Sequence, residues 1–99
     1  MLDQLTVETF EPHVGTTFWV EFPNETRVEL RLASAAKAME SEAAKLPRHP
    51  FSLLFVGPKS FHLQQRMYPL THDALGTLEM FLVPVGEQNE LFLYEAAFA

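Results

Sequence analysis

Residues 16–32, TTFWVEFPNETRVELRL, contain two runs in which apolar and polar side chains alternate. The first run keeps its Phe and Val side chains on one face, while Trp19 lies on the otherwise polar face. The second run, 27–32, places three aliphatic side chains on one face and three charged ones on the other. A period of two is typical of half-buried strands, and Pro23-Asn24-Glu25 supplies turn residues between the runs. The stretch therefore predicts a β-hairpin.

Four further strands are predicted after this hairpin, at 51–56, 67–71, 77–85 and 91–98. The 67–71 strand is expected at a sheet edge, because Pro69 has no N–H to donate to a ladder. Turn residues separate most of the strands, which favours hairpin connections over parallel crossovers. The pattern predicts a mainly β (α+β) fold, either a six-stranded antiparallel sandwich or a partly open barrel.

Two helical pieces complete the predicted fold. Residues 6–11 form a short N-terminal turn, and Phe10 and Val14, four residues apart, are expected to plug one end of the sheet. The segment 33–46 is rich in Ala, Lys, Glu and Met, and its apolar residues recur at steps of three and four. This spacing favours a middle helix that lies on the sheet. A flexible Ala-rich loop is the alternative, since small residues make up most of the apolar stripe.

The length and apolar content indicate one domain, 1–99, with one core. A chain of 99 residues has room for a single continuous core, and 47% of its residues are hydrophobic. The expected core comprises Phe18, Val20, Leu30, Leu32, Phe51, Leu53, Phe55, Leu78, Met80, Leu82, Leu91 and Leu93.

Charge, cysteine content and the absence of long apolar stretches limit the possible partners, chemistry and location of the protein. Seven Lys plus Arg against thirteen Asp plus Glu give a formal charge of -6, so nucleic acid is not expected as a partner. There is no cysteine, which excludes thiolate chemistry and fits a reducing cytoplasm. No stretch approaches the about 18 apolar residues of a membrane span, and no leader pattern opens the chain. We expect a soluble cytoplasmic protein that begins at its native start and does not bind membranes.

No group of residues predicts catalysis, a cofactor or a metal. The four histidines lack the close spacing of metal ligands, and His72-Asp73 is typical of a turn in which Asp73 bonds its own backbone. Ser60 has no Gly-x-Ser-x-Gly elbow. The expectation is therefore that the protein is not an enzyme. An enzyme built around His62, His72 and Asp73 would require these side chains to converge.

Apolar side chains on both faces of several strands favour a binding function. A sheet with two apolar faces needs two covers, and the chain's own helical segments are one possible cover. A protein partner or a second copy of the chain is the other. The expected partner-binding residues are Trp19, Leu54 and Phe81. The alternative function is a carrier of a small apolar ligand, whose barrel mouth would be lined by Phe61, Tyr68 and Phe92.

An uncharacterised family of small bacterial domains of unknown function resembles the chain in four segments. These are Thr6-x-x-x-Phe10-x-x-x-x-Gly15-Thr16-x-Phe18, Phe51-Ser52-Leu53-Leu54-Phe55-x-Gly57-Pro58, Leu75-Gly76-x-Leu78-x-x-Phe81-Leu82-Val83-Pro84-Val85-Gly86 and Tyr94-Glu95-Ala96-x-Phe98. The chain departs from the family pattern at 33–46 and at Met67, where a glycine often precedes the tyrosine. Family members are encoded near phage-tail-collar-like proteins, so the resemblance implies an accessory or assembly role.

Overall fold

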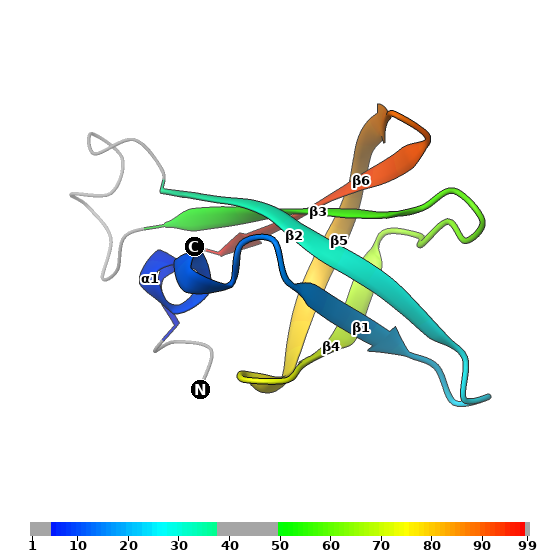
Figure 1. Ribbon diagram of the computed structural model, residues 1–99, viewed down its shortest axis with the longest axis horizontal. Helices are drawn as coiled ribbons and strands as arrows, with labels where there is room; N and C mark the ends of the chain where they lie inside the picture. Colours follow the sequence, from blue (N-terminus) through cyan, green and yellow to red (C-terminus); the bar gives the residue numbers. More distant parts are fainter. Residues whose placement is uncertain (1–4, 38–49, 99) are drawn as a thin grey trace.

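A closed barrel of six antiparallel strands forms the body of the molecule (Figure 1). The computed structural model describes residues 5–37 and 50–98. The strands are β1 (Thr17–Glu21), β2 (Arg27–Lys37), β3 (Phe51–Pro58), β4 (Arg66–His72), β5 (Gly76–Gln88) and β6 (Leu91–Phe98). They follow the order β1-β2-β3-β6-β5-β4 around the barrel, and β4 pairs with β1. The predicted six-stranded antiparallel fold is confirmed, and the barrel rather than the sandwich is the form adopted.

Two three-stranded meanders make up the barrel. In the first, β1 pairs with β2 and β2 with β3; in the second, β4 pairs with β5 and β5 with β6. Residues 59–65 connect the meanders, so that β3 lies beside β6 and β1 beside β4. The β5–β6 hairpin is confirmed, but its turn consists of Asn89 and Glu90 only, whereas the predicted strands leave residues 86–90 between them. Both turn residues have positive φ, at 52° and 67°, as a tight two-residue hairpin turn requires. None of the helices in the described parts of the chain could span a membrane.

The N-terminal segment, made of α1 (Val7–Phe10) and the 3-10 helix η2 (Glu11–His13), covers one end of the barrel. We call this the capped end. Phe10 is fully buried, and its ring centroid lies 5.8 Å from that of Phe51 and 5.9 Å from that of Phe98. Figure 1 shows α1 beside the start of β3 and the end of β6. The short N-terminal helix and the plug formed by Phe10 are confirmed.

Val14 does not join this plug, contrary to the prediction, and 43% of its surface is exposed. The predicted spacing of four requires α-helical backbone from Phe10 to Val14. Instead η2 winds with the tighter 3-10 period, and Val14 itself has extended backbone angles. Its side chain therefore points away from the barrel end.

The middle helix predicted at 33–46 is wrong over the residues that the structure describes. Residues 33–37 continue β2, where Ala35 pairs with Leu53 and Lys37 with Phe51. Helix propensities differ by only a fraction of a kcal/mol per residue, so pairing with β3 outweighs the preference of the Ala-rich sequence. A register shift between Leu32 and Ser34 changes the alternation of side chains. Residues 38–46 lie outside the described parts of the chain.

The barrel interior holds most of the predicted core, including Phe18, Leu30 and Phe55, which are fully buried. Three predicted core residues are only partly buried: Leu78, Leu91 and Leu93. In β6 the opposite phase faces inward, as Tyr94 and Ala96 show. Leu91 and Leu93 share their face with Glu95, and burying that unpaired carboxylate would be costly. Val28, predicted on the inward face of its strand, is buried as well, and the buried apolar residues that the prediction missed include Val7, Val56, Leu63, Tyr68 and Leu70.

Prolines end two of the ladders that close the barrel. The β1–β4 ladder contains the pairs of Trp19 and Val20, and the next position in register would place Glu21 opposite Pro69. The β2–β3 ladder ends at Arg31, and the next hydrogen-bonding position would place Glu29 opposite Pro58. Proline has no N–H to donate in either place. The predicted edge position of β4 is wrong, because β4 pairs on both sides, although its ladder with β1 is short.

Both ladders end at the same end of the barrel. The β1–β2 turn, residues 59–65 and the β5–β6 turn also lie there, and we call it the loop end (Figure 1). The tip of the β1–β2 hairpin extends past the rest of the wall in this region. At the capped end the β5–β6 ladder stops at the pair of Val83 and Glu95, so neighbouring strands separate at both ends of the barrel.

Candidate interaction surfaces

Four apolar side chains lie on the outside of strands β4, β5 and β3, with β6 between β5 and β3. Met67 pairs with Phe81 across β4 and β5, and their exposed fractions are 52% and 45%. Val83 follows on the same face of β5 and pairs with Glu95 of β6, which in turn pairs with Leu54 of β3. Met67, Phe81, Val83 and Leu54 thus form a band across the wall, which we call the outer patch. Two of the three predicted partner-binding residues belong to it.

Two exposed carboxylates border the outer patch. Glu79 precedes Phe81 on the same face of β5, and Glu95 lies between Val83 and Leu54. Within residues 5–37 and 50–98, neither carboxylate has an ion-pair partner. The patch therefore combines apolar area with uncompensated negative charge.

Trp19, the third predicted partner-binding residue, is not part of the outer patch. It lies on the outside of β1 opposite Thr71, whose hydroxyl lies 3.1 Å from that of Thr77 on β5. The Arg27 guanidinium lies 4.9 Å from the centroid of the Trp19 ring and forms a 3.2 Å ion pair with Glu21. Trp19 is partly buried and already covered from within the chain.

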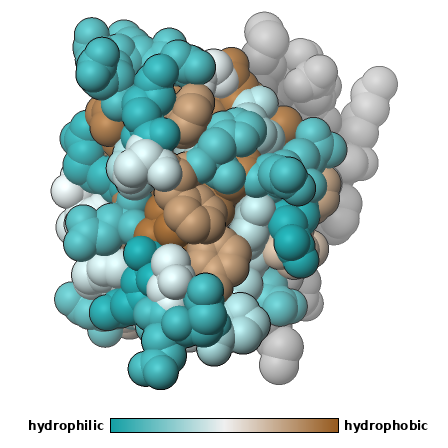
Figure 2. Space-filling model, turned by 90° about the vertical axis from the view of Figure 1, so that its right-hand side faces the viewer, coloured by the Kyte–Doolittle hydropathy of each residue, from teal (hydrophilic) through white to brown (hydrophobic). Residues whose placement is uncertain are grey.

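Aromatic side chains gather at the loop end, where Figure 2 shows an apolar area surrounded by hydrophilic residues. Phe61 is 40% exposed, and its ring centroid lies 5.4 Å from that of Phe22. Tyr68 is buried beside Phe22, with ring centroids 6.2 Å apart. Phe92 contacts the His62 ring at 4.6 Å. The three aromatics predicted for the barrel mouth thus lie at one end, although Tyr68 contributes little surface.

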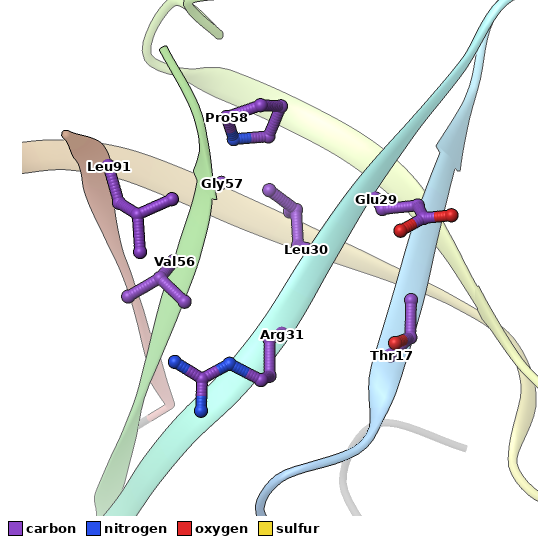
Figure 3. Close-up of a pocket in the computed structure, with 8 residues that line it drawn as sticks. All are labelled: Thr17, Glu29, Leu30, Arg31, Val56, Gly57, Pro58 and Leu91. Carbon is purple, nitrogen blue, oxygen red and sulfur yellow. The ribbon is translucent and has the colours of Figure 1, made fainter.

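A groove of about 330 Å³ opens where β2 and β3 diverge beyond the end of their ladder (Figure 3). Figure 3 shows Leu30 and Gly57 facing each other across the two strands, with Pro58 above them. The groove shares Glu29 and Pro58 with a second groove of about 360 Å³, which continues to Phe61. These grooves connect the side of the barrel with its loop end.

The chain matches one family of domains over residues 5–98, nearly its whole length. It belongs to the DUF6916 family. The description of that family is a domain of unknown function. Searches of curated proteins and of solved structures found no match. The resemblance to an uncharacterised domain family is therefore confirmed. The surface of the DUF6916 domain is the remaining guide to its function.

Gly57 allows the close approach of β3 to the core in the DUF6916 domain. A methyl group at this position would lie 2.6 Å from Leu30 Cδ2 and 3.3 Å from Tyr94 Cε2. Both neighbours are fully buried and cannot move aside without displacing others. We predict that Gly57→Ala lowers the free energy of unfolding by about 1–3 kcal/mol, measured by denaturant titration.

The Leu30→Ala background tests the cause of this effect. Removing the Leu30 side chain takes away the nearest obstacle to the methyl group, so Gly57→Ala should cost much less there than in the wild-type background. An equal cost in both backgrounds would show that overpacking against Leu30 is not the reason.

The residues of the enzyme alternative do not converge. His62 contacts Phe92 at the loop end, whereas His72 and Asp73 lie at the capped end, beside the turn into β5. In that turn His72, not Asp73, accepts backbone hydrogen bonds, which corrects the predicted role of Asp73. Among the described residues, no three His, Cys, Asp or Glu side chains are placed to share a metal ion.

Sequence patterns missed two residues of the outer patch, Met67 and Val83. Met67 belongs to a strand that was predicted correctly, but only the pairing across the β4–β5 hairpin places it beside Phe81. That pairing could have been obtained by folding the two strands about the turn at 73–75. Val83 was assigned to the correct face of its strand without being recognised as part of a binding surface.

Proposed function

We propose that the DUF6916 domain is a non-catalytic protein-binding or assembly module that docks its partner on the outer patch. The observation that carries the proposal is the Met67–Phe81 pair, in which two large apolar side chains on adjacent strands are each about half exposed. Met and aromatic residues are enriched at protein interfaces, where their area is removed from water. Covering the patch would add about 25 cal/mol for each Å² of apolar surface buried.

Charge favours a protein partner with basic residues around its contact surface. Glu79 and Glu95 border the patch without ion-pair partners in the described residues, and the whole chain has a formal charge of -6. Complementary charge raises the association rate of two proteins and fixes their relative orientation more than it increases their affinity. A second copy of the chain is the other possible occupant. The resemblance to domains encoded near phage-tail-collar-like proteins suggests a bacterial tail-like assembly, with the domain acting in the cytoplasm.

Replacing the exposed pair tests this proposal. We predict that Met67→Ser/Phe81→Ser abolishes self-association in sedimentation velocity or, for a different partner, abolishes specific capture from an extract of the host cell. Phe61→Ser is the matched control, since it removes an aromatic ring of similar exposure from the loop end. A monomeric wild-type domain that captures the same proteins as the double variant would contradict the proposal.

A carrier of a small apolar ligand is the second candidate, favoured by a cleft at the loop end. This cleft has a volume of about 270 Å³ and is lined by Phe22, Pro23, Asn24, Thr26 and Phe61. It opens at the surface, beside the aromatic cluster. Titration with a small apolar fluorophore distinguishes the two candidates: a carrier would lose binding in Phe61→Ser and keep it in Met67→Ser/Phe81→Ser.

A further inference from the structure

His72, the last residue of β4, is a polar side chain sealed into the capped end with only 6% of its surface exposed. Its Nδ1 atom accepts hydrogen bonds from the N–H groups of Ala74, at 3.0 Å, and Leu75, at 3.3 Å. Its Nε2 atom lies 2.9 Å from the Thr16 hydroxyl oxygen. Both ring nitrogens therefore have partners inside the protein.

These partners fix the protonation state of the ring. Backbone N–H groups can only donate, so Nδ1 carries no proton and the proton of the neutral ring is on Nε2. Nε2–H then donates to the Thr16 hydroxyl oxygen, and the Thr16 hydroxyl donates to the carbonyl of His13 at 2.6 Å. The arrangement is complete only while His72 is neutral.

The His72 ring joins three parts of the chain. Ala74 and Leu75 belong to the turn between β4 and β5, and Thr16 belongs to the connection between η2 and β1. That connection is tied to β2 as well, because Leu32 donates its N–H to Thr16 and accepts from Gly15. The ring thus links the β4–β5 turn to the connection that leads into β1.

The surroundings of the ring disfavour a second proton. A proton on Nδ1 would face the two N–H donors and remove both hydrogen bonds. Among the described residues, the titratable groups facing the ring are His13 of η2, at 4.7 Å between ring centroids, and Asp73 of the turn. The side of β1 contributes only Phe18, whose ring centroid lies 4.4 Å away. Burial lowers the pKa of His72, His13 lowers it further, and Asp73 opposes this shift.

We propose that His72 is an acid-released latch on the β4–β5 turn at the capped end of the barrel. Protonation of Nδ1 removes its acceptor lone pair, so the bonds to the Ala74 and Leu75 amides are lost and the turn opens, whereas Nε2–H still donates to Thr16. Mild acid thereby opens a turn that is closed at neutral pH. This device is independent of the outer patch and does not rest on the proposed function.

The direction of the pH effect follows from linkage. The folded-state pKa of His72 lies below the ordinary value of 6.5, so the opened state binds a proton more readily than the closed state. The stabilising effect of the latch is fully present above pH 6.5 and is lost as the pH falls through the folded-state pKa. In that interval the opening equilibrium rises by at most about tenfold per pH unit for one proton.

Native-state hydrogen exchange between pH 7.5 and pH 5 tests the latch. After correction for intrinsic exchange rates, we expect the protection of the amides of Ala74 and Leu75, the two groups that donate to Nδ1, to fall several-fold below pH 6.5 in the wild-type domain. His72→Asn should remove this pH dependence, because the Asn carbonyl oxygen accepts the same turn amides but does not titrate. His62→Gln is the matched control at the loop end and should behave like the wild type.

Two results would overturn the latch. One is unchanged protection of these amides down to pH 5 in the wild-type domain. The other is the same acid-induced loss of protection in His72→Asn. If His72→Asn does not fold, His13→Gln gives the second test: removing the imidazole that lowers the pKa of His72 brings that pKa closer to its ordinary value, so the loss of protection in acid should be smaller. An unchanged loss would contradict the role assigned to His72 and its surroundings.

Discussion

Replacing Phe10 by alanine is expected to lower the free energy of unfolding by about 3–5 kcal/mol, the range for removing a buried aromatic side chain. Phe10 is fully buried and lies within 6 Å, between ring centroids, of both Phe51 and Phe98. The helix α1 is only Val7–Phe10, and its other contacts include buried Val7 and an exposed ion pair between Glu8 and Lys37, which stabilises it little. Denaturant unfolding followed by fluorescence and circular dichroism measures the loss.

Val14→Ala is the control for this prediction. Val14 lies four residues further along the same segment and is largely exposed, so its replacement should change stability by about 0.5 kcal/mol or less. A similar small effect of Phe10→Ala would mean that the N-terminal segment does not plug the barrel.

Tyr94→Ala is expected to produce a loss of similar size or larger. Tyr94 is fully buried, and its hydroxyl oxygen accepts a hydrogen bond of 2.9 Å from the backbone N–H of Leu63. Burial raises the pKa of this hydroxyl, which stays protonated at neutral pH. Removing the ring costs about 3–5 kcal/mol. Leaving the buried Leu63 amide without a partner costs about 1–3 kcal/mol more.

Tyr94→Phe separates the two contributions, because it keeps the ring and removes only the hydroxyl. We expect a loss of about 1–3 kcal/mol in equilibrium unfolding. Tyr68→Phe is the comparison: the Tyr68 hydroxyl donates to the carbonyl of Gln64 in a partly buried position, where water can replace it. Equal and small effects of the two substitutions would indicate that water reaches the Leu63 amide when the Tyr94 hydroxyl is gone.

The strands could be predicted from sequence wherever one face is polar and the other apolar. The β1–β2 hairpin is the best case, since apart from Trp19 the residues that alternate with its buried side chains are polar or charged. In β6 both faces of the strand begin with large apolar residues, Leu91 on one face and Phe92 on the other. Only Glu95 shows which of the two faces is exposed to solvent. Weighting that one charge more heavily would have placed Tyr94 and Ala96 in the core.

The end of β2 could not be predicted from local sequence. Residues 33–37 have a composition typical of a helix, and only the neighbouring strand β3 explains why they are extended. The closure of the barrel was hidden for a similar reason. Pro69 indicates that one backbone N–H of β4 is missing from a ladder. The two pairs that nevertheless join β4 to β1, formed by Leu70 and Thr71, depend on the tertiary fold.

The candidate surface was predicted in part. The sequence indicates Leu54 and Phe81 because they lie on the second apolar face of their strands, and both lie on the outer patch. It indicates Trp19 as an exposed anchor, but Arg27 covers the Trp19 ring. An interaction across a hairpin is not visible in the spacing of residues along one strand. The His72 latch also depends on tertiary contact, since Thr16 is 56 residues away in the chain.

The closed wall of the barrel affects how this chain behaves at high concentration. Nine Phe and 47% hydrophobic residues would favour fibrillar polymerisation if long strand edges were free. Closure leaves unpaired stretches only where neighbouring strands diverge, and at two of these places Pro58 and Pro69 have no N–H to donate to an incoming strand. The same two prolines that interrupt the wall thereby help to keep neighbouring molecules from adding to it.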